Sequence, residues 1–281
     1  MPILSCDVPE SVLAALQQRS RATGEETSTF VSRVLGRILE MPMHTLFQVS
    51  TSRALVQGVY KEAVSSALLL SHGDFGLGTF DELDGEMVVL DGVVYQVRSD
   101  GTVHRVDGDT GTPFATVLHF SPDDTVLLKN IQSFAGLCAI CDKQRTSQNL
   151  FYAFRVDGVF SFMHTRAMQR TQSGTSLKMA ASTQPEFQFK DLEGTLVGFW
   201  SPLFAGSVDI PGYHFHFLSK DRTKGGHVLE CAGSDLQLQV QAVNDFHLSM
   251  PDTEEFLRAD LTADLSKDLS AAEGNHSTRN S

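Results

Sequence analysis

Three histidines in the last third of the chain have types and spacing that could hold a metal ion. His214 and His216 are separated by one residue within an aromatic, apolar run (212–218). Because successive side chains of a strand alternate between its two faces, both imidazoles would lie on one face. A polar segment that ends in two glycines (219–226) predicts a hairpin turn, so His227 would return on the neighbouring strand. The three imidazoles would then converge.

Zinc in catalytic sites is typically held by three protein ligands, with one position left for water or substrate. The four cysteines, at positions 6, 138, 141 and 231, are not spaced to complete a closed structural zinc site. Three imidazoles also accept cobalt, nickel or copper. The alternative interpretation is that His214 and His216 are an ordinary pair on a half-exposed strand.

The composition limits the classes of partner. The chain has 281 residues and a formal charge of -12, with 34 acidic against 22 basic side chains, which argues against nucleic acid as the main ligand. No run approaches the roughly 18 apolar residues of a spanning helix, and the N-terminus lacks a signal pattern. We therefore expect a cytoplasmic protein without a membrane partner. Cys138 and Cys141 have apolar neighbours and are interpreted as buried thiols.

The middle of the chain predicts short strands that hold the histidine hairpin in place. Residues 87–97 read as a hairpin with an Asp-Gly turn at 91–92, and residues 115–120 as a further strand. Residues 132–141 predict a helix, and residues 150–162 predict a strand, a turn at Asp157-Gly158 and a second strand. Residues 236–241 alternate strictly, which indicates a strand with one wet face.

The first forty residues predict a separate small unit. Residues 3–8 could form a strand, Pro9 starts a helix, and Ser28 caps a second helix. This order resembles the ribbon-helix-helix unit, in which two chains pair strands that enter the DNA major groove. The predicted strand would present Asp7 and no basic residue, however. We interpret the segment as a dimerisation or packing element rather than a DNA reader.

Together these patterns predict an α+β protein of two β-rich parts behind a short helical N-terminal extension. The predicted divisions are residues 1–40, an N-terminal β-rich domain at 41–185 with mixed or antiparallel sheet, and a barrel-like C-terminal domain at 186–281 that binds the metal and carries an active-site tail.

Several sequence blocks, in this order, resemble the α-acetolactate decarboxylase family from about residue 44 to residue 273. They are residues 73–80, 83–86, 98–101, 113–114, 198–202, 213–216, 221–222 and 225–227. The resemblance implies a zinc-dependent carboxy-lyase that removes CO2 from 2-acetolactate to give acetoin. We also expect the protein to be a homodimer. Zinc would act as a Lewis acid that stabilises the enediolate left by decarboxylation.

The resemblance also implies site residues. His214, His216 and His227 would be the zinc ligands, and Thr79 would line the pocket. The remaining positions match Glu86, Arg166 and Glu273; Arg166 would pair with the departing carboxylate, and Glu86, alone or with Glu273, would relay the proton. Arg170 and Glu255 are near alternatives to Arg166 and Glu273, so these two assignments stay open. By residue pattern alone, Glu86 is typical of an exposed turn and Arg166 of a surface cation.

Two further functional classes stay open. A zinc-dependent hydrolase or isomerase on a similar scaffold would also use His-x-His and a glutamate. A DNA-binding regulator whose C-terminal part senses a metabolite is the third hypothesis, which the acidic balance of the chain opposes.

Overall fold

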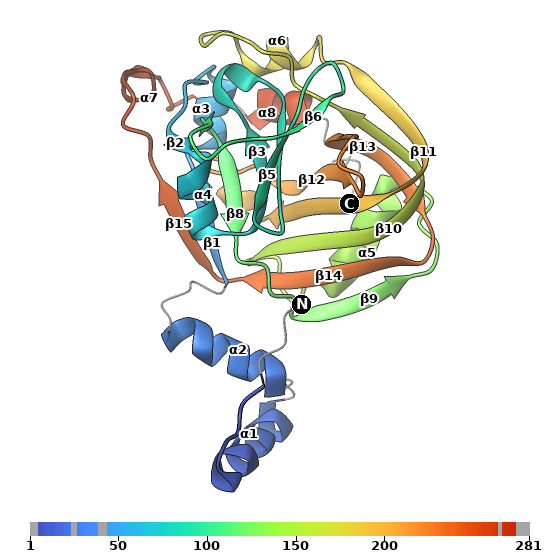
Figure 1. Ribbon diagram of the computed structural model, residues 1–281. Helices are drawn as coiled ribbons and strands as arrows, with labels where there is room; N and C mark the ends of the chain where they lie inside the picture. Colours follow the sequence, from blue (N-terminus) through green and yellow to red (C-terminus); the bar gives the residue numbers. More distant parts are fainter. Residues whose placement is uncertain (1–4, 24–26, 39–43, 264–265, 274–281) are drawn as a thin grey trace. The chain divides into compact units, whose positions relative to one another are not determined.

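The computed structural model describes residues 5–23, 27–38, 44–263 and 266–273. The chain divides into two compact units, residues 1–43 and residues 44–281. The protein is a mixture of helix and sheet in which strands predominate, as Figure 1 shows. None of the described helices has the length and apolar character needed to cross a membrane.

The described part of the first unit contains two helices, α1 (Glu10–Thr23) and α2 (Thr27–Ile38). Helix α1 starts directly after Pro9, whose carbonyl accepts the first helical hydrogen bonds, and the guanidinium of Arg19 lies 4.7 Å from the ring centre of Phe30. The predicted strand is absent from the described residues 5–9, and residues 1–4 and Gly24 lie outside the described chain. The ribbon-helix-helix resemblance is therefore not supported.

The second unit contains a seven-stranded sheet in the order β15-β1-β8-β3-β4-β5-β6. The edge strand β15 pairs parallel with β1, and every other pairing in this sheet is antiparallel. Its strands are β1 (Thr45–Val49), β3 (Phe75–Thr79), β4 (Glu86–Leu90), β5 (Val93–Val97), β6 (Val103–Arg105), β8 (Ala115–Leu118) and β15 (Asp245–Ser249). The predicted β4–β5 hairpin is confirmed, since Asp91 and Gly92 both have positive φ, as a type I′ turn requires.

A six-stranded sheet has the order β11-β12-β13-β10-β14-β9, and β11 also pairs with β10. Its strands are β9 (Asp124–Leu128), β10 (Phe151–Arg166), β11 (Glu186–Ser201), β12 (Gly212–Ser219), β13 (Gly225–Gly233) and β14 (Leu236–Val243). Strand β10 pairs with three strands, β11, β13 and β14. A small two-stranded sheet joins β2 (Val64–Ser65) to β7 (Gly111–Thr112). The barrel-like form expected for the C-terminal part stays a prediction.

The predicted turn at Asp157-Gly158 is wrong, because β10 runs through these residues without interruption. The Asp157 side chain does not close a turn; it accepts hydrogen bonds from Thr195 on β11 and from Arg155. The predicted boundary at residue 185 also does not separate the two large sheets. Strands β9 and β10 precede it but belong to the six-stranded sheet, whereas β15 follows it but belongs to the seven-stranded sheet.

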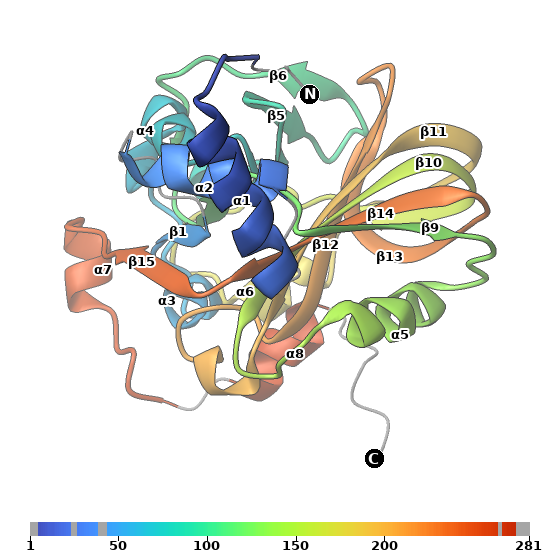
Figure 2. The ribbon, with the colours of Figure 1, turned by 90° about the horizontal axis from the view of Figure 1, so that it is seen from below.

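Within the described residues of the second unit, six helices accompany the sheets. They are α3 (Ser52–Val56), α4 (Ser66–His72), α5 (Phe134–Gln144), α6 (Leu177–Ala181), α7 (Glu254–Arg258) and α8 (Ser266–Glu273), with short 3-10 turns at Asp81–Leu83 and Leu203–Ala205. The predicted helix at 132–141 is confirmed as α5, which starts where the Ser133 side chain accepts from the Gly136 N–H. Figure 2 shows α5 beside the strands of the six-stranded sheet.

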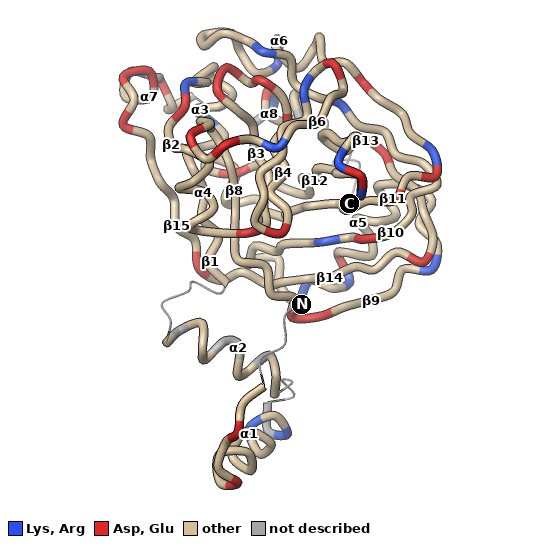
Figure 3. Tube along the Cα trace, in the orientation of Figure 1, with Lys and Arg blue, Asp and Glu red and all other residues tan. Residues whose placement is uncertain are grey.

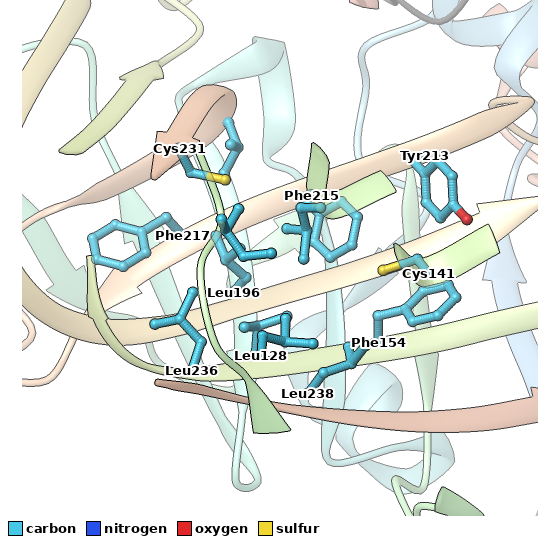
Figure 4. Close-up of a cluster of buried hydrophobic side chains, with 14 of the residues drawn as sticks. Leu128, Cys141, Phe154, Leu196, Tyr213, Phe215, Phe217, Cys231, Leu236 and Leu238 are labelled. Atoms are coloured by element: carbon cyan, nitrogen blue, oxygen red, sulfur yellow. The ribbon is translucent and has the colours of Figure 1, made fainter. Parts of the chain in front are cut away.

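The largest apolar core lies between α5 and the six-stranded sheet. Leu137 and Cys141 of α5 belong to the same buried cluster as Phe154, Phe215 and Phe217 (Figure 4). Burial raises the pKa of the Cys138, Cys141 and Cys231 thiols. These cysteines are therefore apolar packing groups, as the sequence indicated for Cys138 and Cys141.

Charged residues are dispersed over the second unit. Figure 3 shows acidic and basic positions interspersed along the trace, and the described segments contain no long basic stretch.

Candidate metal centre and active site

The β12–β13 hairpin brings the three histidines together as the sequence predicted. His216 on β12 is paired in register with His227 on β13, and His214 lies on the same face as His216. Nε2 of His214 lies 3.1 Å from Nε2 of His216 and 3.1 Å from Nδ1 of His227. His216 and His227 are buried, and His214 is partly buried. Three ring nitrogens therefore point toward a common centre.

The tautomer of His216 is fixed by the other sheet. Its Nδ1 donates a hydrogen bond to the backbone carbonyl of Met87 on β4, at 2.8 Å. The proton is thus on Nδ1, and the Nε2 lone pair faces the other histidines. Such a hydrogen bond on the far side of the ring is the usual way in which a ligating imidazole is oriented.

Two of the histidines, His214 and His216, are held in the neutral form that a metal requires. Burial, with the positive charge of Arg166 as a second cause, lowers the pKa of His214 to about 3. Burial also lowers the pKa of His216 well below its ordinary value, with His214 and Arg166 adding to the effect. At neutral pH no proton competes with a cation for these nitrogens.

The arrangement fits a tetrahedral metal ion. Two nitrogens that each lie roughly 2.0–2.1 Å from such an ion are about 3.3 Å apart, close to the 3.1 Å separations here. Three imidazoles suit zinc and also cobalt, nickel and copper. The donor set therefore supports a metal centre without fixing which metal it holds.

Glu86, the first residue of β4, lies beside this centre and is not an exposed turn residue. It is only 5% exposed. Its Oε1 accepts a hydrogen bond from the Met168 backbone N–H at 2.9 Å, and its Oε2 lies 3.4 Å from Nε2 of His216. The sequence Asp84-Gly85 suggested a surface turn. Glu86 instead begins strand β4, and its side chain lines the cavity around the histidines.

Arg166, the last residue of β10, stands opposite His227 in register. Its Nη2 donates to the carbonyl of Ala272 on α8 at 2.5 Å. Its Nε is buried and has no hydrogen-bond partner among the described residues. Arg166 thus turns one charged edge into the protein rather than toward solvent.

The near neighbours that the sequence left open lie elsewhere. Arg170 is exposed and pairs with Glu82, with Nε donating to Oε2 at 2.8 Å. Glu255 on α7 accepts from the backbone N–H of Lys61 at 3.1 Å. Neither lines the cavity around the histidines. Glu273 ends α8, and its side chain lies outside the described residues.

The three histidines, Glu86 and Arg166 line one cavity. Its empty volume of about 440 Å³ includes open solvent at its mouth. Its polar lining comprises Thr79, Glu86, Arg166, Gln184 and the three histidines. Its apolar wall comes from a cluster that α3, α6 and α8 share with neighbouring loops; the residues common to both are Leu55, Leu83, Phe114, Met168, Leu177, Ile210 and Ala272. The hydroxyl of Thr79 donates to the Gly85 carbonyl at 2.8 Å.

Sequence reasoning missed several members of the site. Met87 and Ala272 act through backbone carbonyls, which carry no residue-type signal. Gln184 lies in a polar stretch between two elements, where an amide side chain suggests nothing more than a loop. Only the tertiary structure brings these residues to the site.

The chain is similar to proteins of one family over most of its length. The sequence profile described as alpha-acetolactate decarboxylase matches residues 46–263. An alpha-acetolactate decarboxylase of Methanosarcina mazei is 42% identical over 231 residues, which cover 81% of this chain and 80% of that protein. One from Bacillus subtilis is 35% identical over 237 residues, covering 84% of this chain and 93% of that one.

Solved structures agree with this similarity. The crystal structure of alpha-acetolactate decarboxylase from Bacillus subtilis superimposes with a TM-score of 0.79 at 34% identity, covering 82% of this chain and 99% of that one. A Staphylococcus aureus protein, described as of unknown function and similar to alpha-acetolactate decarboxylase, gives a TM-score of 0.77 at 32% identity, covering 81% and 99%. The chain therefore belongs to the alpha-acetolactate decarboxylase family.

Proposed function

We propose that the protein is a metal-dependent acetolactate decarboxylase, which converts 2-acetolactate into acetoin and CO2. The observation that carries this proposal is the convergence of three imidazoles beside a buried glutamate and an arginine, in one cavity, in a chain of this family. The substrate is a β-keto acid with a hydroxyl between its keto and carboxylate groups. Its chemistry needs a place for negative charge and a source of one proton.

His214, His216 and His227 would hold the metal, which we propose to be zinc. When bound, the metal supplies a Lewis acid to the substrate oxygens, an effect worth several kcal/mol. The hydrogen bond from His216 to the Met87 carbonyl keeps the ligand nitrogen turned to the centre, and the low pKa values keep the imidazoles unprotonated. The protein thus presents the ligands before any metal arrives.

Arg166 would bind the substrate carboxylate. Its Nε is buried and has no partner among the described residues, while Nη2 is held by the Ala272 carbonyl. An unpaired charged donor inside a protein is costly unless a ligand pairs with it. A carboxylate is the anionic group that the guanidinium fork suits best. Arg166 would orient the C–CO2 bond for cleavage.

Glu86 would deliver the proton that replaces CO2 on the substrate carbon. Its Oε1 is held by the Met168 N–H, so the carboxyl group has a fixed orientation with Oε2 toward the histidines. A positioned acid or base of this kind typically contributes about 10²–10⁴ in rate. Because the group lies on one side of the cavity, it would protonate one face of the substrate and give a chiral product.

The rest of the cavity would exclude water and complete the site. The apolar wall from α3, α6 and α8 lowers the local dielectric, which strengthens every charge interaction inside. Thr79 would line the substrate position, and Glu273 would assist Glu86 from the end of α8. A homodimer and a cytoplasmic location are further proposals; sedimentation of the purified protein and cell fractionation test them.

The decisive experiment measures acetoin formation from racemic acetolactate by the purified protein, before and after a chelator and again after zinc is restored. The proposal expects activity that disappears and returns with the metal. His164→Ala is the matched control for His216→Ala, because His164 lies on β10 outside the cavity and pairs with Glu186. Stoichiometric metal without acetoin would refute decarboxylation, and ester hydrolysis would then be the next activity to measure.

A further inference from the structure

Gln184 is a cavity residue to which no role has been assigned. It follows α6 and directly precedes Pro185 and β11, and it lines the same cavity as Arg166 and the histidines. Its side-chain amide nitrogen contacts the sulfur of Met168. Its carbonyl oxygen, Oε1, is buried and has no hydrogen-bond partner within the described chain.

The contact with Met168 determines which end of the amide is left over. A thioether sulfur accepts weak hydrogen bonds and has no proton to give, so only the NH2 group of Gln184 can pair with it. The carbonyl oxygen is then the end that lacks a partner. A buried acceptor without a donor costs free energy, and a ligand that brings a donor removes that cost.

The proposed substrate carries a matching donor. Ionised acetolactate has a keto oxygen and a carboxylate, which only accept, and one hydroxyl, which can donate. Among the described residues, the Arg166 Nε is a donor without a partner in the same cavity, and it matches the carboxylate. The Gln184 Oε1 is an acceptor without a partner in the described part of the chain, and the hydroxyl is the group on this substrate that can satisfy it.

We propose that Gln184 accepts a hydrogen bond from the 2-hydroxyl of the substrate and so selects 2-hydroxy-3-keto acids over 3-keto acids without that hydroxyl. The inference rests on the proposed function and deepens it. Gln184 would bind the hydroxyl while Arg166 binds the carboxylate. Both groups are attached to the carbon that loses CO2, so these two contacts would fix the orientation of that carbon in the cavity. A site built around a substrate hydroxyl rejects the analogue without it, because its own polar group is then left unpaired.

The test compares two stable probes by calorimetry on the metal-loaded protein. The probes are 2,3-dihydroxy-2-methylbutanoate and 3-hydroxy-2-methylbutanoate, which differ in the 2-hydroxyl and cannot decarboxylate as β-keto acids do. The wild-type protein is expected to bind the first probe about 10- to 100-fold more tightly. Gln184→Met, which keeps the length of the side chain but removes its oxygen, should reduce this preference to less than about threefold.

Two further variants separate recognition from folding. Gln184→Glu retains an acceptor, so it should keep the preference while it weakens both anionic probes by charge repulsion. Thr183→Ala changes an exposed neighbour outside the cavity and should leave both dissociation constants unchanged. Metal content and the melting temperature verify that each variant is folded and loaded.

Three outcomes would overturn the inference. A preference that survives in Gln184→Met would assign the hydroxyl to another group that lines the cavity, such as Glu86 or the metal. An equal loss of both probes in that variant would make Gln184 a packing residue. A wild-type protein without any preference would remove hydroxyl recognition altogether. Acetoin formation by the wild-type protein is measured separately, so failure of the decarboxylase proposal is distinguishable from failure of this one.

Discussion

Replacing Glu86 by glutamine isolates the proton-transfer role that the structure suggests for this residue. The amide has the same shape, and its carbonyl oxygen can still accept from the Met168 N–H, which now lies 2.9 Å from Oε1. The three imidazoles are untouched. Folding and metal content should therefore change little, while the group beside His216 loses its ability to exchange a proton at neutral pH.

The expected size of the effect follows from this geometry. A positioned acid or base contributes about 10²–10⁴ in rate, which corresponds to about 2.7–5.5 kcal/mol of activation free energy. The affinity for substrate should change much less, because Arg166 and the metal ligands remain in place. The loss should thus be seen in kcat more than in KM.

The assay measures kcat and KM for acetoin formation together with the metal-to-protein ratio and the melting temperature. Glu230→Gln is the matched control, because Glu230 on β13 also accepts a backbone N–H, from Phe134, but does not line the cavity. It should retain wild-type kcat. A Glu86→Gln enzyme with full metal and a kcat within threefold of wild type would refute the proposed role of Glu86.

Three other predictions test the metal ligands, their protonation and the packing beneath them. His216→Ala should abolish stoichiometric metal in elemental analysis, and full retention would remove His216 from the ligand set. In the metal-free protein, the pKa values of His214 and His216 are lowered in the folded state, so below the unfolded histidine pKa of about 6.5 the unfolded state binds more protons than the folded state. The free energy of unfolding in urea should therefore fall as pH decreases below that value, by up to about 1.4 kcal/mol per pH unit for each histidine. It should fall less steeply in a His214→Gln, His216→Gln variant. A parallel pH dependence in both proteins would contradict this. Gly198→Ala places a Cβ 2.1 Å from the Phe215 ring, so the urea midpoint of the variant should drop by the equivalent of about 1–3 kcal/mol in unfolding free energy. An unchanged midpoint would show that the ring can move aside without cost.

The parts of the structure that could be predicted from sequence are those determined by short-range pattern. The β4–β5 hairpin follows from Asp91-Gly92, and the histidine hairpin from the spacing of His214 and His216 and the glycines before His227. In both, the turn and the strand period act over about ten residues, where local preferences decide the structure. The convergence of the three histidines could therefore be predicted from the sequence alone.

The parts that could not be predicted depend on contacts between distant segments. Met87 is 129 residues from His216, and Ala272 is 106 residues from Arg166, so no pattern in a window of sequence links them. The turn expected at Asp157 failed for a related reason, because Thr195 on a distant strand binds its carboxylate and keeps the backbone extended. Burial of Glu86 likewise comes from neighbours outside its own segment.

The parallel pairing of β1 with β15 has a consequence for how the protein forms. The Thr45 hydroxyl donates to Asp245, 200 residues further along the chain, so the edge of the seven-stranded sheet cannot close until residues 245–249 have been synthesised. Contacts of such long range slow folding, because the chain must lose loop entropy before the pairing rewards it. Until β15 has been synthesised, one edge of β1 would have no strand to pair with. Unpaired strand edges promote aggregation, and chaperones protect them.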